Sequence, residues 1–575
     1  MKHWQSLVGL LATAILQGVN AAPSSILDLF NPSPIPKVTI QSPKASISGI
    51  PGDIESFIGI PFAKPPVGSR RLRPPEPITE PLGDIEATHE QCTCPQFFVD
   101  ANQQFSIVAQ LGKWFDAMPT QKALGESEDC LYLSVFRPKG TKPGDKLPVL
   151  YWIFGGGFEL GWTSMYDIAG PPWVAASVAQ NQPIIFVSVG YRVGGFGFMP
   201  GKEMKDDGAA NIGLLDQRLG MQWVADNIEA FGGDPEKVTI WGESAGSISV
   251  YDHTVMYDGD NTYKGKQLFR GGIMNSGTVV PAHDMAHSKP QNIYNRVVEA
   301  GGCSGASDTL SCLRGLDYET FLNATNSVNA ILDYSSVALS YLPRPDGKTL
   351  TASPDELTLA KKYTHVPLIV GDQEDEGTLF SIFQLNITTV QEVGEYLQKY
   401  FFTDLTPDLQ QELLANYEDD RENGSPFRTG DAYRIYPQFK RLAAVLGDLV
   451  FNLSRRVTIG FIEKQSPDIK IWSYLSSYDQ GTPLLGTFHG SDILQVIYGL
   501  KPNYAADSFK QYYISFVNHG DPNKGVDQSK YRHWPLYSEG HQLLNTYGDH
   551  SKLVTDDYRN GSSKFISEHI TSFHI

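Results

Sequence analysis

Short apolar runs alternate with amphipathic segments through the middle of the chain. Six of these runs predict buried strands: residues 147–154, 183–192, 237–242, 270–277, 366–371 and 469–477. Residues 211–231 instead carry apolar side chains at helical spacing and end at Gly232-Gly233, which predicts a helix. Buried strands that alternate with helices are typical of a mostly parallel sheet covered on both faces.

This pattern predicts an α/β fold with a large, mostly parallel central sheet flanked by helices. The sequence has no internal repeat and no low-complexity block. Its 575 residues are enough for several average domains, yet a large α/β enzyme can keep one sheet and carry long insertions. We predict a single domain over residues 22–575.

The first 21 residues have the pattern of a secretory signal peptide. Lys2 provides positive charge, residues 6–16 form a short apolar core, and small residues precede the expected cleavage near Ala21. This core is too short to span a bilayer, and no later segment offers the roughly 18 uncharged apolar residues of a transmembrane helix. We expect a secreted protein without a transmembrane anchor.

Composition and charge limit the classes of molecule that this protein is expected to bind. With 41% hydrophobic and 19% charged residues, the chain has the composition of a globular protein. Its formal net charge of −18 argues against nucleic acid or an anionic membrane as a main partner. A solvated acidic surface is the simplest explanation of that charge.

An exported chain can form disulfides, and the odd count of five cysteines leaves at least one outside any intrachain pair. Cys303 and Cys312 are close enough in sequence to close a local loop. Cys94 and Cys130 would close a loop with 35 residues inside it, with Cys92 as the spare, although Cys92 and Cys94 can exchange roles. The spacing does not suit zinc, because no second cysteine pair has matching histidines.

Asn-x-Ser/Thr acceptors are candidate glycan sites in an exported chain. The five acceptors are Asn323, Asn386, Asn423, Asn452 and Asn560. Asn423 is the weakest of them, because Pro426 follows its Ser425. Such motifs are common by chance, so we expect roughly two or three to be used.

The segment Gly242-Glu243-Ser244-Ala245-Gly246 fits the pattern G-x-S-x-G of a nucleophile elbow. In that motif the chain turns so sharply from strand to helix that larger flanking side chains would collide. The pentapeptide alone is weak evidence, because glycine and serine are common in turns. The context strengthens it, since a strand-like run precedes Ser244 and a segment able to start a helix follows.

A serine that attacks a carbonyl needs backbone N–H donors for the oxyanion that forms. The N–H of Ala245, at the start of the expected helix, is one candidate. The glycines at 155–157 directly follow the apolar run 147–154 and offer a second source, because backbone without Cβ atoms can turn its N–H groups toward a cavity. The alternative is a flexible turn.

The serine hydroxyl also needs a base, and the base needs an orienting acid. In this architecture the acid and then the histidine follow the serine along the chain. Four acids after the run 366–371 fit the pattern equally well: Asp372, Glu374, Asp375 and Glu376. His489 follows the strand-like run 469–477 and lies between small residues, which makes it the best candidate for the base.

At these residues the sequence resembles the type B carboxylesterase/lipase family, which includes the cholinesterases. It is most similar to the fungal secreted lipases of the Candida rugosa and Geotrichum type. The matching stretches span nearly the whole mature chain: GIPFAKPPVGSRRLRPP, ESEDCLYLSVFRP, WIFGGGFELG, NIGLLDQR, VTIWGESAGS, PRPDGK, GDQEDEGT, GSPFRTG, LGTFHGSD and ISFVNHGDPN. The resemblance implies the α/β-hydrolase fold.

The resemblance also assigns roles that the pattern leaves open. It implies Glu376 as the acid, His489 as the base, and Gly156, Gly157 and Ala245 as oxyanion donors. The family's disulfides fall on Cys94–Cys130 and Cys303–Cys312, so that Cys92 departs from the family pattern, and its structural ion pair falls on Arg71 and Glu128. Glu243 and Asp492 correspond to acids beside the serine and the histidine in relatives.

The loop between Cys94 and Cys130 bears on substrate choice. Its residues Ile107, Leu111, Trp114 and Met118 repeat at helical spacing, and Phe105, Val108 and Phe115 widen the same apolar face. In the fungal lipases the similar loop is a lid over the active site. We expect a lid that opens at a lipid surface, and the alternative is an insertion that packs on the core.

We therefore predict a secreted serine hydrolase of carboxylic esters that needs no metal and no organic cofactor. We expect the substrate to be a long-chain lipid ester, with triacylglycerol as the favoured one, reached through transient contact with a lipid interface. The alternatives are a carboxylesterase for soluble short-chain esters, a sterol esterase and, remotely, a non-catalytic cholinesterase-like binding protein. Either a monomer or a homodimer is compatible with the sequence.

Overall fold

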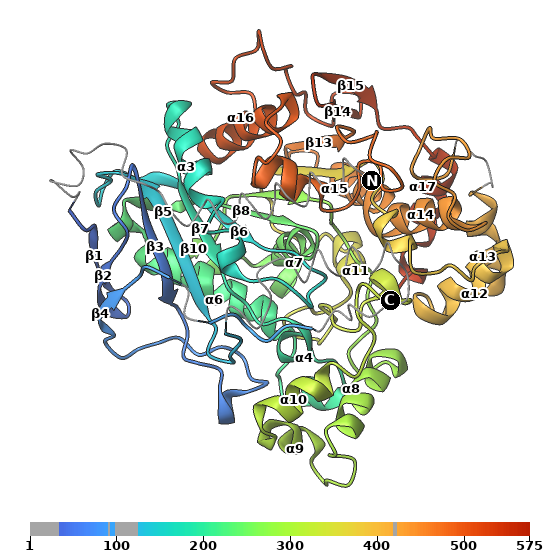
Figure 1. Ribbon diagram of the computed structural model, residues 1–575, viewed down its shortest axis with the longest axis horizontal. Helices are drawn as coiled ribbons and strands as arrows, with labels where there is room; N and C mark the ends of the chain where they lie inside the picture. Colours follow the sequence, from blue (N-terminus) through green and yellow to red (C-terminus); the bar gives the residue numbers. More distant parts are fainter. Residues whose placement is uncertain (1–33, 90–91, 98–124, 418–422) are drawn as a thin grey trace.

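The computed structural model describes residues 34–89, 92–97, 125–417 and 423–575. Within these ranges, ten strands form one twisted central sheet (Figure 1). From one edge to the other they are β3 (Ile54–Pro61), β5 (Tyr132–Pro138), β7 (Ile185–Val189), β6 (Leu147–Ile153), β8 (Gly233–Glu243), β11 (Gly271–Asn275), β12 (Leu368–Gln373), β13 (Ile471–Ser476), β14 (Gln542–Thr546) and β15 (Ser551–Thr555). The neighbours from β7 to β14 are parallel, and β3, β5 and β15 pair antiparallel at the edges.

The six predicted strands are confirmed as β6, β7, β8, β11, β12 and β13. They form the middle of the sheet, where both faces are covered and the residues are almost all buried. A second sheet was not predicted: β1 (Lys37–Gln41), β2 (Lys44–Ser48) and β4 (Gly83–Glu86) form a three-stranded sheet. Its strands alternate exposed and buried residues or are short, so a search for continuous apolar runs does not find them.

Helices cover both faces of the central sheet. On one face lie α3 (Gly170–Ala179) and α16 (Tyr504–His519), where Trp173 and Tyr513 pack on Trp241 of β8. On the other face lie α6 (Ile212–Asn227) and α7 (Ala245–Gly259), where the hydroxyl of Tyr151 in β6 donates to the Gln217 carbonyl in α6. The helix predicted over 211–231 is thus confirmed as α6, followed by a short 3-10 turn at Ile228–Phe231.

The remaining helices form two groups beside the sheet. In Figure 1, α8 (Ser288–Ala300), α9 (Thr309–Gly315) and α10 (Tyr318–Thr325) lie together at the bottom. The second group, at the right of the figure, comprises α12 (Val390–Tyr400), α13 (Pro407–Ala415), α14 (Phe439–Gly447) and α17 (Asn560–His569). Helix α11 (Pro354–Leu359) contacts α7 and α15 (Leu453–Gln465), and α15 in turn contacts α17. No helix in the described ranges combines the length and the apolarity needed to cross a bilayer.

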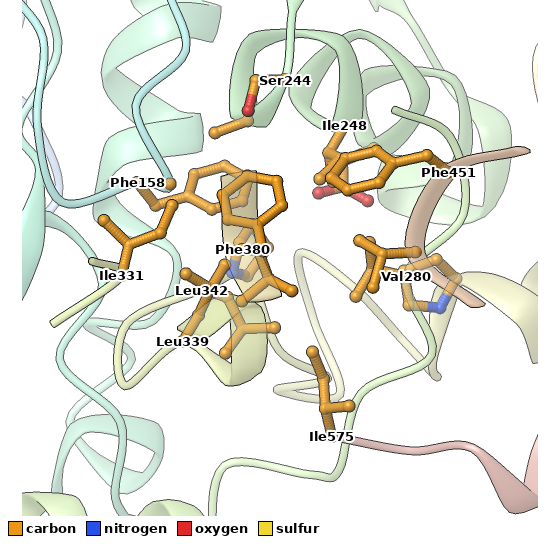
Figure 2. Close-up of a pocket in the computed structure, with 17 residues that line it drawn as sticks. Phe158, Ser244, Ile248, Val280, Ile331, Leu339, Leu342, Phe380, Phe451 and Ile575 are labelled. Carbon is orange, nitrogen blue, oxygen red and sulfur yellow. The ribbon is translucent and has the colours of Figure 1, made fainter. Parts of the chain in front are cut away.

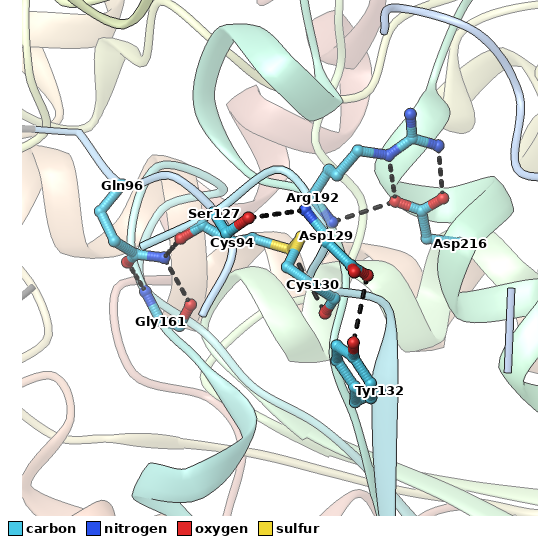
Figure 3. The surroundings of a disulfide bond; sticks show 9 residues. All are labelled: Cys94, Gln96, Ser127, Asp129, Cys130, Tyr132, Gly161, Arg192 and Asp216. Atoms are coloured by element: carbon cyan, nitrogen blue, oxygen red, sulfur yellow. Dashed lines mark hydrogen bonds and ion pairs between the residues drawn. A yellow bond between two sulfur atoms is a disulfide. The ribbon is translucent and has the colours of Figure 1, made fainter. Parts of the chain in front are cut away.

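Both disulfides implied by the family resemblance are present, Cys94–Cys130 and Cys303–Cys312. The first is fixed to the glycine-rich loop after β6, because Gln96 Nε2 donates to the Gly161 carbonyl at 3.0 Å while the Gly161 amide donates to Gln96 Oε1 at 2.7 Å (Figure 3). The lid residues Ile107, Leu111, Trp114 and Met118 lie outside the described residues, as does the signal peptide, and both stay predictions. The single domain over 22–575 also stays a prediction.

The glycan acceptors differ in accessibility. Asn323, Asn386, Asn423 and Asn560 are exposed. Asn452 is only 2% exposed, and its Nδ2 donates to the Gln373 carbonyl at 3.0 Å. A glycan on Asn452 would have to displace the packing around β12, so the expectation of a glycan there is corrected.

Candidate active site

Ser244 lies in the sharp turn between β8 and α7. Its backbone angles are φ 56° and ψ −125°, a conformation that costs energy for a residue with a side chain. The Ser244 amide donates to the Asn275 carbonyl at the end of β11 at 2.9 Å, and the Ser244 carbonyl accepts from the Ile248 amide at 2.9 Å. The neighbouring strand and the first turn of α7 therefore hold the strained residue in place.

The flanking glycines are required by close backbone contacts. A Cβ atom on Gly242 would lie 2.8 Å from the Ser247 amide nitrogen and even closer to the Gly246 carbonyl. A Cβ atom on Gly246 would collide with the carbonyl oxygen of Ile153 in β6. The atoms that exclude larger side chains at the two glycines of the G-x-S-x-G pattern are therefore backbone atoms of Ile153, Gly246 and Ser247.

A continuous chain of hydrogen bonds runs from Ser244 through His489 to Glu376. His489 Nε2 lies 2.8 Å from Ser244 Oγ, and His489 Nδ1 lies 2.6 Å from Glu376 Oε2. Glu376 Oε1 accepts from the Gln373 amide at 2.6 Å. All three side chains are buried, and the imidazole packs against the ring of Phe451 with the centroids 4.5 Å apart.

The four acids that the sequence could not separate have four different partners. Asp372 pairs with the buried Arg455 at 2.8 Å, and Glu374 pairs with Arg428. Asp375 accepts hydrogen bonds from three groups in two loops. Only Glu376 of these four contacts His489, so the geometry favours the acid that the family resemblance implies.

Asp375 has a structural role that the sequence analysis did not assign. Its Oδ1 accepts from the Ser425 hydroxyl and the Phe427 amide, both at 2.9 Å, and its Oδ2 accepts from the Thr487 amide at 3.0 Å. Burial raises the pKa of Asp375 to about 7. This carboxyl joins the loop around Phe427 to the loop that carries His489.

Two further acids, Glu243 and Asp492, lie beside the serine and the histidine. Glu243 Oε1 is 3.6 Å from His489 Nε2, and burial, together with the nearby carboxylates, raises the pKa of Glu243 well above its usual range. Burial also raises the pKa of Asp492, to about 6, although Asn275 Nδ2 donates to Asp492 Oδ2 at 2.9 Å. Burial thus favours the neutral form of both carboxyl groups, and at Asp492 the hydrogen bond from Asn275 opposes this effect.

Asn275 is a residue of the site that the sequence analysis missed. Besides accepting from the Ser244 amide and donating to Asp492, it receives hydrogen bonds at Oδ1 from Trp241 Nε1 at 3.2 Å and from the Tyr513 hydroxyl at 3.0 Å. Its only signal in the sequence is a polar side chain at the carboxyl end of a parallel strand, where sites of α/β proteins lie.

The glycine-rich loop after β6 comes close to the serine turn. Gly156 and Gly157 have φ values of 109° and 65°, a region that favours glycine, and a Cβ atom on Gly157 would collide with Ile331. A Cβ atom on Gly155 would lie 2.9 Å from that of Ser244. Gly157 and Ala245 border the same pocket as Ser244, so the structure brings these predicted oxyanion donors to the serine.

An apolar pocket lies beside Ser244. Aromatic and aliphatic side chains dominate its lining, and Figure 2 shows Ser244 at one end of the ring of side chains and Ile575 at the other. The labelled residues between them are Phe158, Ile248, Val280, Ile331, Leu339, Leu342, Phe380 and Phe451. A pocket with this apolar lining suits a hydrocarbon chain.

Within the described ranges, one group of side chains has the composition of a metal site. Candidate ligand atoms of His283, His287 and Asp404 lie within 4.8 Å of one another. The two imidazoles are stacked at 3.8 Å with an angle of 10° between their planes, which keeps their lone pairs in parallel planes instead of directing them at one ion. His287 Nδ1 also accepts from the Lys289 amide, so we assign no metal to this group.

Comparisons with known proteins agree with this geometry. Residues 39–566 match the model of the Carboxylesterase family. The chain is 57% identical to secreted lipase 1 of Botryotinia fuckeliana, covering 94% of each protein, and 54% identical to a secreted triacylglycerol lipase of Gibberella zeae, covering 92% of this chain and 90% of that protein. The crystal structure of Aspergillus niger EstA superposes with a TM-score of 0.78 at 25% identity, covering 94% of this chain and 99% of that one. The chain therefore belongs to the carboxylesterase family and has its α/β-hydrolase fold.

Proposed function

We propose that this secreted carboxylic ester hydrolase acts on long-chain lipid esters such as triacylglycerols, with Ser244 as nucleophile. The observation that carries the proposal is the hydrogen-bonded chain Ser244–His489–Glu376 at the mouth of an apolar pocket. The pocket offers hydrocarbon contacts to an acyl chain, and the serine stands where the carbonyl of that acyl chain would enter.

The hydrogen bonds define the direction of proton transfer. Because Nδ1 of His489 donates to Glu376, its Nε2 carries the lone pair that can take the Ser244 proton. As the proton leaves, Ser244 Oγ bonds to the ester carbonyl carbon, and the carbonyl oxygen becomes an oxyanion. Glu376 stabilises the imidazolium that results and fixes the orientation of its ring.

The oxyanion is stabilised by the backbone N–H groups of Gly156, Gly157 and Ala245. When the tetrahedral intermediate breaks down, His489 Nε2 gives its proton to the alcohol oxygen, which leaves, and the acyl group stays on Ser244 Oγ. Water then attacks the acyl carbon while His489 takes the proton from it. Release of the fatty acid returns the proton to Ser244 Oγ, so the cycle consumes one water and one ester.

The names of the relatives support this choice of substrate. The Botryotinia protein is named a secreted lipase and the Gibberella protein a secreted triacylglycerol lipase. The structure adds that the pocket beside Ser244 is lined almost entirely by apolar side chains, as a long acyl chain requires.

The role of Ser244 is tested by Ser244→Ala, measured on triolein emulsion and on p-nitrophenyl butyrate. Removal of the nucleophile is expected to lower kcat by roughly 10⁴-fold or more on both substrates. Ser249→Ala is the matched control: this buried serine is in the same helix, and its hydroxyl donates to the Ala245 carbonyl. The control should stay within a few-fold of wild type, and full activity of Ser244→Ala would refute the mechanism.

The substrate class is tested with p-nitrophenyl esters from C2 to C16 and with triacylglycerol titrated across its solubility limit. We expect kcat/KM to rise with chain length, because each buried methylene contributes about 0.8 kcal/mol of binding. The rate should also rise once an emulsion forms. Preference for C2 together with no response to emulsion would favour a carboxylesterase of short soluble esters.

A further inference from the structure

One acidic side chain, Asp252, lies in the lining of the otherwise apolar pocket. Asp252 is only 1% exposed, and neither of its carboxyl oxygens has a hydrogen-bond partner among the described residues. Buried polar groups in folded proteins nearly always find such a partner, so a carboxyl left open toward a cavity calls for an explanation.

The surroundings of Asp252 offer no structural reason for an acid. Its neighbour His253 bonds through Nε2 to Gln217 Oε1, and the hydroxyl of Thr254 donates to the Tyr251 carbonyl, so neither of these bonds involves Asp252. Burial alone raises the pKa of Asp252 well above its usual range. Burial therefore favours the neutral carboxyl, which has one O–H to donate and a carbonyl oxygen to accept.

The position of Asp252 along α7 relates it to the site of reaction. Ser244, Ile248 and Asp252 are spaced four residues apart, so they lie on one face of the helix, and all three line the pocket. Eight residues of helix at 1.5 Å each place Asp252 about 12 Å along the axis from Ser244. An extended chain advances about 1.2 Å per bond, so 12 Å corresponds to roughly ten bonds of an acyl chain.

We propose that Asp252 is a specificity-determining residue that recognises an oxygen on the acyl chain. The geometry points to a hydroxylated fatty acyl group with its hydroxyl about ten bonds from the ester carbonyl. The hydroxyl would accept from and donate to the Asp252 carboxyl while the hydrocarbon on either side contacts the apolar lining. This inference rests on the proposed function, because it assigns a class of acyl chain to the same pocket.

The test compares p-nitrophenyl esters of 12-hydroxyoctadecanoate and octadecanoate, which differ only in the hydroxyl. Wild type should hydrolyse the hydroxylated ester with a kcat/KM between about two- and tenfold higher, the range that one hydrogen bond contributes. Asp252→Leu should reverse the preference, because the hydroxyl then loses its partner. Asp252→Asn keeps a donor and an acceptor and should retain the preference.

Two controls distinguish recognition of the acyl hydroxyl from a general loss of activity or stability. The butyrate ester is too short to reach Asp252, so its hydrolysis should be the same in wild type and in the Asp252 variants. Thr254→Val changes a buried polar side chain of the same helix outside the pocket lining and should leave the ratio of the two long esters unchanged. Asp252→Leu removes an unpartnered buried acid, so it should fold at least as well as wild type.

Equal kcat/KM for the two long esters in wild type, or an unchanged ratio in Asp252→Leu, would overturn the inference while leaving the proposed function standing. Failure of wild type to hydrolyse the butyrate and the octadecanoate esters would instead overturn the proposed function, and the inference with it.

Discussion

Two buried carboxyl groups next to the Ser244–His489 pair differ in what favours their ionisation. Burial and the neighbouring carboxylates raise the pKa of Glu243 well above its usual range, whereas at Asp492 the hydrogen bond from Asn275 opposes burial and the pKa is raised to about 6. A negative charge close to His489 stabilises the imidazolium that forms during the reaction, and a neutral carboxyl does not. The family resemblance pairs the two acids, and of the two we expect Asp492 to supply this charge near neutral pH.

Replacement of Asp492 should therefore have a pH-dependent effect. Asp492→Asn keeps an oxygen to accept from Asn275 but removes the charge that is present above pH 6. We expect kcat/KM to fall by roughly threefold to tenfold at pH 8. At pH 5 wild-type Asp492 is itself mostly protonated, so the two proteins should converge there. Activity profiles from pH 5 to pH 9 give the measurement.

Glu243→Gln is the matched control for the charge. Because burial favours the neutral form of Glu243, we expect the amide to change kcat/KM by less than about threefold, with no trend over the same pH range. A loss above pH 7 in Glu243→Gln that equals the loss in Asp492→Asn would contradict the assignment of the charge to Asp492.

At the scale of elements, the turn from β8 to α7 tolerates no side chain at Gly246. Gly246→Ala would push a methyl group into the Ile153 and Phe154 carbonyls of the adjacent strand end, so β6 and α7 would have to separate. We expect loss of most activity and a melting temperature lower by several degrees, as for a destabilisation of about 2–3 kcal/mol. Differential scanning fluorimetry and p-nitrophenyl butyrate hydrolysis measure the two effects.

Gly460→Ala in α15 is the control for that substitution. A Cβ atom there meets nothing within 4 Å, and the residue is exposed. Alanine is the better helix former by about 0.5–1 kcal/mol, so this variant should melt at the same temperature or slightly higher and keep full activity. Equal damage from the two glycine replacements would rule out the steric explanation at Gly246.

The central strands and the serine turn were predictable because their signals are local. Apolar runs marked β6, β8 and β12, and the glycines around Ser244 marked the turn. The acid was not predictable from pattern, because four carboxyl groups within five residues differ only in the partners that other segments bring to them. Asn275 and Asp252 were missed for the same reason, since each has its role through contacts or a cavity formed by segments far away in sequence.

At the scale of the whole molecule, a buried ion-pair cluster joins the middle of the chain to its C-terminal part. Arg455 in α15 bonds to Asp372 in β12 and to Asp556 after β15, both at 2.8 Å. Arg456 reaches the same Asp556, and the Tyr537 hydroxyl donates to it at 3.0 Å. Although burial opposes ionisation, the two guanidinium groups lower the pKa of Asp556 to about 2.

This cluster predicts the response of the fold to acid. Because the folded pKa of Asp556 is below its ordinary value of 3.8, the stabilisation is complete above about pH 4 and is lost as the pH falls toward 2. Asp556→Asn should lower the free energy of unfolding at pH 7 by roughly 2–4 kcal/mol, because it leaves buried guanidinium charge uncompensated. The difference from wild type should shrink as the pH falls toward 2.

Urea denaturation followed by tryptophan fluorescence at pH 7, 4 and 2.5 measures the difference. Asp84→Asn, at an exposed position of the small sheet, is the control and should stay within about 0.5 kcal/mol of wild type at each pH. A constant difference between Asp556→Asn and wild type at all three values would show that packing, and not charge, accounts for it.

The groups that we propose to carry out the reaction and much of the pocket lining come from different stretches of chain. Ser244, Glu376 and His489 follow β8, β12 and β13, whereas Ile331, Leu339 and Leu342 belong to one irregular segment between α10 and α11. Substitutions at Leu339 and Leu342 are therefore expected to alter which fatty acid is released more than how any ester is cleaved, whereas Ile331 also lies against Gly157. Hydrolases that descend from one ancestor with this fold can therefore diverge in substrate specificity through substitutions in a single loop. A combinatorial library restricted to that loop should be rich in active variants.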